Sequence, residues 1–244
     1  MERRLQRLHW LRVRELVPQQ IDTALLPVGT VEAHGTACIG TDNIIPEAIC
    51  AGIAERLQAL IAPTIPYGIT KSLYRYPGGF TVEPQTFSLY IADVLRSLHD
   101  TGFVNVFLIN GHGGNNAVLK DVAYEAHRRW SLRVCVIHWW EMCAEMTIEH
   151  FGHAGGHSGT DEAAMVQAID ESLIDVPAHD DDLAYYYRRG ADVYPVPGSI
   201  LLYKENEGYP VFDIEDARRY HAKVITMVGD FAAMVLDRWR RYQL

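Results

Sequence analysis

The chain alternates apolar runs that end in turn residues with amphipathic segments of helical length. The apolar runs cover residues 23–29, 60–68, 104–114 and 132–140, and the amphipathic segments between them cover residues 44–60, 86–103 and 115–130. Strands and helices that alternate at these lengths form βαβ units, in which the strands are parallel. The sequence therefore predicts an α/β fold with a mainly parallel central sheet covered by helices.

The part of the chain after residue 150 is less regular. A loop rich in glycine and histidine leads to a helical pattern at 160–173, and a last helical pattern covers 213–244. The stretch between them, 174–212, is too long for a simple connection and predicts a surface excursion that encloses a substrate or contacts another subunit. Because no repeat or low-complexity tract divides the chain, we expect a single domain over residues 1–244.

Composition argues against several classes of function. The formal net charge of −9 disfavours the broad basic surface that binds nucleic acid. No apolar run approaches the ~18 residues of a membrane span, and the first residues, MERRLQRLHW, do not look like a secretory signal. We therefore expect a cytoplasmic protein with no nucleic-acid or membrane partner. A chain of this size buries about 70% of its unfolded surface, so any metal would serve chemistry rather than folding.

The segment LPVGTVEAHGTACIGTDNIIP, residues 26–46, places metal-type side chains directly after the first apolar run. Glu32 and His34 are two residues apart, so in an extended chain both point to the same side and could hold one ion together. Asp42 precedes the helical pattern at 44–60, where it serves either as a bridging carboxylate or as a helix N-cap.

A histidine also follows the third apolar run, at His112 in INGHGGNN. Glycines on both sides let the backbone turn sharply and present the imidazole, although the same residues fit a turn with an incidental histidine. In an open parallel sheet, ligands bind beyond the carboxyl ends of the strands, because the loops there converge on one edge. We therefore expect Glu32, His34, Asp42 and His112 to lie in one neighbourhood.

The third segment is HFGHAGGHSGTDEAAM, in which three histidines and two carboxylates share a glycine-rich loop that opens a helix. These residues are His150, His153, His157, Asp161 and Glu162. Favourable interactions with the helix N-terminus explain the two acids but not the histidines. The segment therefore indicates a metal and proton-transfer site.

A protein nucleophile is not indicated, since no serine or cysteine stands in a nucleophile-elbow pattern. A metal-activated water is the more natural nucleophile, because a bound ion lowers the pKa of water toward ~7. Mixed histidine and carboxylate ligands suit Zn²⁺, Mn²⁺ or Fe²⁺ and leave positions for water and substrate.

With these residues in view, the sequence resembles the creatininase family of metal-dependent amidohydrolases. Four motifs carry the resemblance in order over about residues 20–175: LPVGTVEAHG…GTD, YPGGFTVEPQTF, DTGFVNVFLINGHGGNN and GHSGTDEAAM. The resemblance implies a three-layer α/β/α subunit, one or two divalent ions per subunit and a homohexamer.

The same resemblance implies roles for individual side chains. Metal ligands fall at Glu32, His34, Asp42 and His112, with Asp42 bridging the ions where two are bound. His157 falls where a histidine assists proton transfer. Glu162 falls where a carboxylate lies at the metal site, as a ligand or as a second proton carrier.

Three departures from the family pattern bear on the substrate. Creatininases carry a glutamate two residues after the strand-end histidine, where this chain has Gly114, so the second ion site is weaker, filled by Glu162 or empty. The first loop has Ala33 and Ala37 where glutamine and histidine are frequent. The TDEAA segment lacks two hydroxyl groups near the site. We therefore expect a substrate other than creatinine.

These observations lead to one hypothesis and its rivals. We expect a hydrolase that cleaves a C–N bond of a small, polar cyclic amide or formamide. One alternative is a C–C hydrolase that opens a cyclic diketone derived from an inositol-type sugar. Another is a non-catalytic metal-binding subunit, and a purely structural role for the motifs predicts a protein without bound metal.

Overall fold

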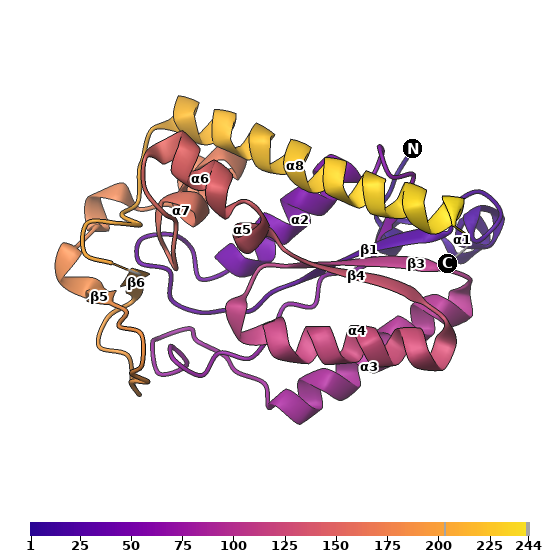
Figure 1. Cartoon of the computed structure of the whole chain (residues 1–244), viewed down its shortest axis with the longest axis horizontal. Coiled ribbons are helices and arrows are strands. Elements are labelled where there is room, and N and C mark those ends of the chain that lie inside the picture. The colour runs from indigo at the N-terminus through magenta and orange to yellow at the C-terminus, as the bar shows by residue number, and fades with distance from the viewer. Residues whose placement is uncertain (203, 243–244) are drawn as a thin grey trace.

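The computed structural model of the protein describes residues 1–202 and 204–242 and has an α/β fold in three layers (Figure 1). A four-stranded parallel sheet in the order β2-β1-β3-β4 forms the middle layer. Its strands are β1 (Thr23–Val28), β2 (Leu60–Ile61), β3 (Asn105–Asn110) and β4 (Arg133–His138). The predicted fold class is confirmed.

Helices cover both faces of the sheet. Helices α3 and α4 pack together on one face, while α2, α7 and α8 pack against one another on the other face (Figure 1). The α-helices are α1 (Trp10–Leu16), α2 (Thr41–Ile53), α3 (Pro84–Thr101), α4 (Asn116–Trp130), α5 (Trp139–Met142), α6 (Ala144–Phe151), α7 (Thr160–Ile169) and α8 (Ile214–Arg241). The short 3-10 helices are η1 (Leu5–Arg7), η2 (Gly113–Asn115), η3 (Glu171–Leu173), η4 (Val176–Ala178) and η5 (Asp181–Leu183).

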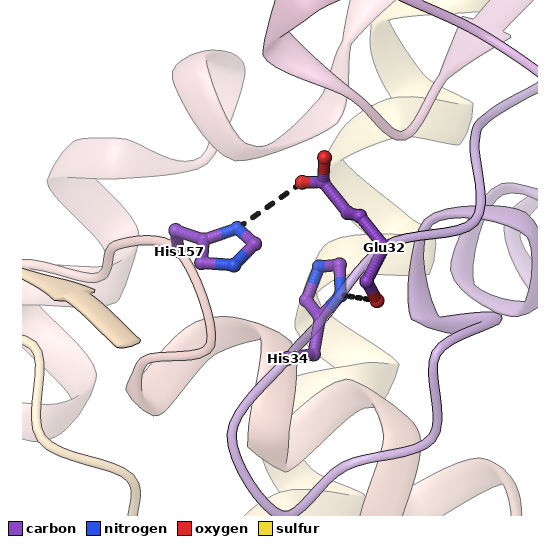
Figure 2. Close-up of side chains that lie close together, drawn as sticks. All are labelled: Glu32, His34 and His157. Atoms are coloured by element: carbon purple, nitrogen blue, oxygen red, sulfur yellow. Dashed lines mark hydrogen bonds and ion pairs between the residues drawn. The ribbon is translucent and has the colours of Figure 1, made fainter. Parts of the chain in front are cut away.

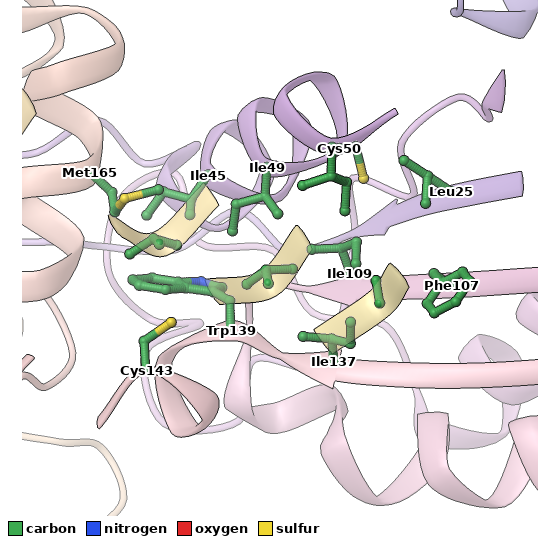
Figure 3. Close-up of a cluster of buried hydrophobic side chains, with 14 of the residues drawn as sticks. Leu25, Ile45, Ile49, Cys50, Phe107, Ile109, Ile137, Trp139, Cys143 and Met165 are labelled. Carbon is green, nitrogen blue, oxygen red and sulfur yellow. The ribbon is translucent and has the colours of Figure 1, made fainter. Parts of the chain in front are cut away.

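Side chains of the central strands alternate between two cores, as the two-residue period of a strand requires. Leu25 and Phe107 pack with α2 and α8, in the core that Figure 3 shows around Trp139. Leu26 and Leu108 point to the other face and pack with α3 and α4. Both faces of the sheet are therefore buried, which explains why these strands read as continuous apolar runs.

The strands end level with one another. Val28 of β1 pairs with Asn110 of β3, and Asn110 pairs with His138 of β4. The segments that follow the three strands consequently start from one edge of the sheet.

Several expected elements end earlier than predicted. The helix expected at 44–60, for example, is α2, which ends at Ile53. The expected strand at 60–68 is reduced to Leu60–Ile61, because Pro63 and Pro66 cannot donate backbone hydrogen bonds to a neighbouring strand. The helix expected at 160–173 ends at Ile169, and Asp170 then caps the short helix η3 by accepting a hydrogen bond from the backbone N–H of Ser172.

The region 174–212 contains a small separate sheet, in which β5 (Ala184–Tyr186) pairs in parallel with β6 (Ile200–Leu202). Leu201 of β6 also pairs with His157 through an isolated bridge. This long region therefore lies against one of the predicted site residues. Nowhere in the described ranges is a helix both long and apolar enough to cross a membrane.

Candidate metal centre

The ends of β1 and β3 bring four of the predicted residues together, and α2 supplies one of them. Glu32 and His34 lie on the segment after β1, and His112 follows β3. Asp42 lies in the first turn of α2, whose backbone approaches both strand ends closely. A Cβ atom at Gly29 or Gly111 would overlap the Asp42 carbonyl group, so glycine is required at both strand ends.

Asp42 lies between two histidines. Its Oδ1 atom is 2.9 Å from Nε2 of His34, and its Oδ2 atom is 3.0 Å from Nδ1 of His112. The N-cap position of α2 belongs to Gly40, and no side chain caps this helix. Of the two roles that the sequence left open for Asp42, the geometry therefore fits the bridging carboxylate.

Each of these two histidines uses its other ring nitrogen to bind a backbone carbonyl. Nδ1–H of His34 donates to the carbonyl oxygen of Glu32 at 3.0 Å, and Nε2–H of His112 donates to that of Ile69 at 3.0 Å. A carbonyl oxygen is only an acceptor, so the ring nitrogen that faces it carries the proton. The opposite nitrogen of each ring, which faces Asp42, is then left to act as a ligand, as in most metal-binding histidines.

The glycine-rich loop before α7 adds His157 to this cluster. Its Nε2–H donates to the carbonyl of Ala33 at 2.7 Å, and its Nδ1 lies 3.5 Å from Oε1 of Glu32 (Figure 2). The ring centroids of His157 and His34 are 4.3 Å apart. The first and third sequence motifs therefore meet at one site.

Glu162, in the first turn of α7, approaches the same cluster. Its Oε2 atom accepts a hydrogen bond from the backbone N–H of Ser158 at 2.6 Å and lies 3.5 Å from Nε2 of His34. Asp161 also faces the site, held by the backbone N–H of Gly156 at 3.0 Å.

Two histidines of the third motif do not join the cluster. Nδ1 of His153 faces the carbonyl oxygen of Ala154 at 3.2 Å, and His153 is in none of the groups of potential ligands. His150 contacts Asp216 and Lys223 of α8, and its side chain is buried against them. The sequence pattern could not separate this residue from His157, because both stand in the same short stretch.

Three groups of side chains have ligand atoms close enough to hold an ion. Within each group the ligand atoms lie within 4.8 Å of one another, and the groups are Glu32–Asp42–His112, His34–Asp42–Glu162 and Glu32–His34–His157. Oε2 of Glu32, Nε2 of His34 and Oδ2 of Asp42 are buried without a hydrogen-bond partner in the described part of the chain. Buried polar atoms are rarely left in this way, and their mixed nitrogen and oxygen chemistry fits a divalent ion.

The pKa values of the cluster reflect this crowding of buried charges. Burial alone would lower the pKa of His34, but the carboxylates of Asp42 and Glu162 raise it to about 10. Burial likewise opposes protonation of His112, yet Glu32 and Asp42 raise its pKa well above the usual range. The site thus attracts positive charge strongly.

His157 behaves in the opposite way. Burial, together with the nearby charge of His34, lowers the pKa of His157 to about 4. His157 is therefore neutral near pH 7 and able to accept a proton.

The turn after His112 has no room for a further side chain. A Cβ atom at Gly114 would overlap the carbonyl oxygen of Ile69, the same oxygen that accepts the hydrogen bond from His112. In this backbone conformation, the glutamate that is typical of the family at this position would require the Ile69 carbonyl to move. In the described part of the chain, the carboxylate of Glu162 lies beside His34 and Asp42, so Glu162 can take the place of that glutamate.

A cavity of about 380 Å³ opens onto the cluster. Its walls include Trp140 and Leu201, whereas Trp139 is fully buried in the core shown in Figure 3. Glu141 and Ile148 also line this cavity, although no sequence pattern singled them out. The signal for Glu141 is the position of α5 directly after β4, since a residue that follows a strand end faces the same edge as His112.

The comparisons with known proteins agree with this geometry. The Creatininase family model, described as creatinine amidohydrolase, matches residues 6–199. Creatinine amidohydrolase from Pseudomonas putida is 26% identical in an alignment 174 residues long, and the alignment covers 62% of this chain and 66% of that protein. The 3-dehydro-scyllo-inosose hydrolase from Thermotoga maritima is 31% identical over 106 residues, 42% of this chain and 33% of that protein. Each alignment spans less than two thirds of the relative.

A solved structure shows the same fold over nearly the whole length. A mutant creatininase of the Zn-Zn type has a TM-score of 0.82 at 22% identity, covering 97% of this chain and 99% of that one. The family model covers well over half of the chain. The matched region includes the three motifs that contribute side chains to the cluster, which are those around Glu32, His112 and His157. The protein therefore belongs to the creatininase family of metal-dependent amidohydrolases.

Proposed function

We propose that this protein is a hydrolase that uses a metal-activated water to cleave a C–N bond of a small cyclic amide or formamide other than creatinine. One observation carries the proposal: Asp42 lies between His34 and His112, and the second nitrogen of each ring is fixed by a backbone carbonyl. The proposed ligands are Glu32, His34, Asp42, His112 and Glu162.

The proposed ligands divide into two ion positions that share Asp42. Glu32 and His112 complete one position, and His34 and Glu162 complete the other. A divalent ion, whether zinc, manganese or iron, would lower the pKa of a water molecule and polarise the substrate carbonyl. The exclusion of a side chain at Gly114 supports Glu162 as the carboxylate of the second position.

His157 is the proposed proton carrier. Its ring is held by the carbonyl of Ala33, and its pKa of about 4 leaves Nδ1 free to take the proton of the attacking water. Transfer of this proton to the leaving nitrogen completes the reaction. Glu162 is a second candidate for this role, because burial raises its pKa well above the usual value of a carboxylic acid.

Elemental analysis of protein purified without added metal tests the centre first. We expect one or two equivalents of zinc, manganese or iron in the wild type and a loss of metal in both His34→Ala and His112→Ala. Metal at background level, or metal unchanged in both variants, would contradict the proposal and return the motifs to a structural role.

A second candidate reaction is hydrolysis of a C–C bond in a cyclic diketone, which the similarity to the inosose hydrolase favours. The products separate the two reactions. Amide or formamide cleavage releases an amine or formate, whereas diketone opening gives a keto acid without loss of nitrogen. A subunit that binds metal and turns over no compound of either class would be a non-catalytic member of the family.

Two further expectations concern the whole protein. We propose a homohexamer of the 27.6 kDa chain, which light scattering coupled to size-exclusion chromatography would test. We also propose a cytoplasmic location, which fractionation of the source cells would test.

A further inference from the structure

Glu141 occupies a distinctive place in the wall of the site cavity. It lies on α5, directly after the edge strand β4, and it lines the cavity together with Ala144 and Ile148 of α6. Ala144 and Ile148 are four residues apart and therefore lie on one side of α6, while Glu141 reaches the cavity from the preceding helix. Glu141 is exposed, and it also lines a neighbouring groove of about 880 Å³, so it stands at the rim of the site rather than among the buried ligand atoms.

A relay of amide side chains holds Glu141 in position. Nδ2 of Asn116 donates to Oε1 of Glu141 at 2.9 Å, and Nδ2 of Asn110 donates to Oδ1 of Asn116 at 2.9 Å. Oδ1 of Asn110 in turn accepts the backbone N–H of His112 at 3.2 Å. The rim carboxylate is therefore fixed relative to a proposed metal ligand, as substrate positioning requires.

The relay leaves one side of the carboxylate free. Oε1 of Glu141 is engaged by Asn116, while Oε2 makes no hydrogen bond to any described residue. An ionised carboxylate accepts hydrogen bonds and donates none, so its natural partner is an N–H or O–H group. The bond is strongest when that group is cationic.

The charges of the cavity point to the same kind of partner. Neither lysine nor arginine occurs among its described lining residues. The other acids of the lining belong to the metal-type groups, apart from Asp161, which is buried and engaged by Gly156. Glu141 is thus the exposed charge that a substrate meets away from the reacting carbonyl.

We propose that Glu141 is a specificity-determining residue, which binds an amino or amidino substituent of the substrate through its free carboxylate oxygen. This inference rests on the proposed metal centre, because the ion fixes the carbonyl end of the substrate. Compounds with an anionic substituent at the same place are disfavoured by repulsion in a cavity that is already acidic.

The test compares matched probes on the zinc-loaded protein. Hydroxamates bind zinc through their two oxygens, and glycine hydroxamate and β-alanine hydroxamate carry an ammonium group at different distances from that end. Propanohydroxamate and butanohydroxamate have the same respective sizes without the charge. Dissociation constants from calorimetry are compared for wild type, Glu141→Gln and Glu145→Gln, with zinc content measured for each protein.

We expect at least one ammonium probe to bind the wild type about tenfold more tightly than its neutral match, the size of one charge-assisted hydrogen bond. Glu141→Gln keeps the shape of the side chain and should abolish this preference. Glu145→Gln removes an equal charge from an exposed residue of α6 outside the cavity and should retain it.

The experiment distinguishes a failure of the role proposed for Glu141 from a failure of the proposed metal centre. A preference that persists in Glu141→Gln, or the absence of any preference in the wild type, would overturn the role of Glu141 while the neutral probes still report an intact metal centre. If none of the four probes bound the zinc-loaded wild type, the proposed metal centre would be wrong and the inference would fall with it.

Discussion

The Oδ1 atom of Asp42 lies 2.9 Å from Nε2 of His34, on the side of the imidazole opposite to its hydrogen bond with a backbone carbonyl. Both side chains are almost completely buried, and Nε2 makes no hydrogen bond of acceptable geometry in the described part of the chain. A buried acid and base this close without a well-formed hydrogen bond are more consistent with two ligands of one ion than with a structural ion pair.

Asp42→Asn should weaken metal binding at both proposed positions. The amide offers one oxygen where the carboxylate offers two, and it removes the negative charge that the positions share. We expect zinc affinity to fall by about 100-fold or more, since even changes behind the ligands cost 10–100-fold. Competition with a fluorescent chelator would measure it.

Asp121→Asn is the matched control for this change, because Asp121 is an exposed residue of α4. Its zinc affinity should equal that of the wild type. Equal affinity in Asp42→Asn would instead show that Asp42 is no ligand.

Gly114→Ala should damage both the fold and the centre. The new methyl group would overlap the carbonyl of Ile69, which holds the ring of His112. We expect the free energy of unfolding in urea to fall by about 1–3 kcal/mol, as for other overpacked sites, and zinc affinity to fall with it.

The neighbouring glycine provides the control. A Cβ atom at Gly113 would meet Trp140 at an ordinary contact distance of 3.8 Å, so Gly113→Ala should leave the unfolding free energy nearly unchanged. Equal effects of the two substitutions would contradict the steric argument.

Zinc binding should release protons at neutral pH. The pKa of His34 is raised to about 10, so this ring is protonated at pH 7.5 in the metal-free protein, and the carboxylates of Glu32 and Asp42 raise the pKa of His112 as well. A ligand nitrogen must lose its proton, and we therefore expect release of at least one proton per zinc-loaded centre and affinity that falls as the pH is lowered.

Calorimetry in buffers with different ionisation enthalpies counts these protons. The apparent binding enthalpy should depend on the buffer in the wild type and depend less on it in His34→Ala. Enthalpies that do not vary with the buffer would mean that the rings are neutral before zinc binds.

The sequence predicted the strand ends well because parallel strands align their carboxyl ends. His112 lies 70 residues after Asp42 in the sequence. Each of the two segments that carry Glu32, His34, Asp42 and His112 nevertheless follows a recognisable strand, so one rule about sheet edges placed all four together. The buried strands β1 and β3 are also clear in the sequence, since each reads as a continuous apolar run, and the half-buried edge strand β4 shows a similar run.

Other features depend on contacts that no local pattern encodes. The expected strand at 60–68 is cut short by two prolines. The need for glycine at position 114 arises from the carbonyl of Ile69, forty-five residues earlier. Glu141 escaped notice because α5 has only four residues, too few to show a helical period.

His157→Gln separates the two roles that the geometry allows for this histidine. As a proton carrier, His157 contributes to turnover and not to metal binding, so the variant should retain wild-type zinc content and lose about 100-fold or more in kcat on the substrate that the screen identifies. As a ligand, within the group Glu32–His34–His157, it would contribute to metal affinity, and the variant would lose zinc.

His153→Gln is the control, since His153 belongs to the same loop but to none of the three ligand groups. Full turnover in His157→Gln with full zinc content would leave Glu162 as the proton carrier.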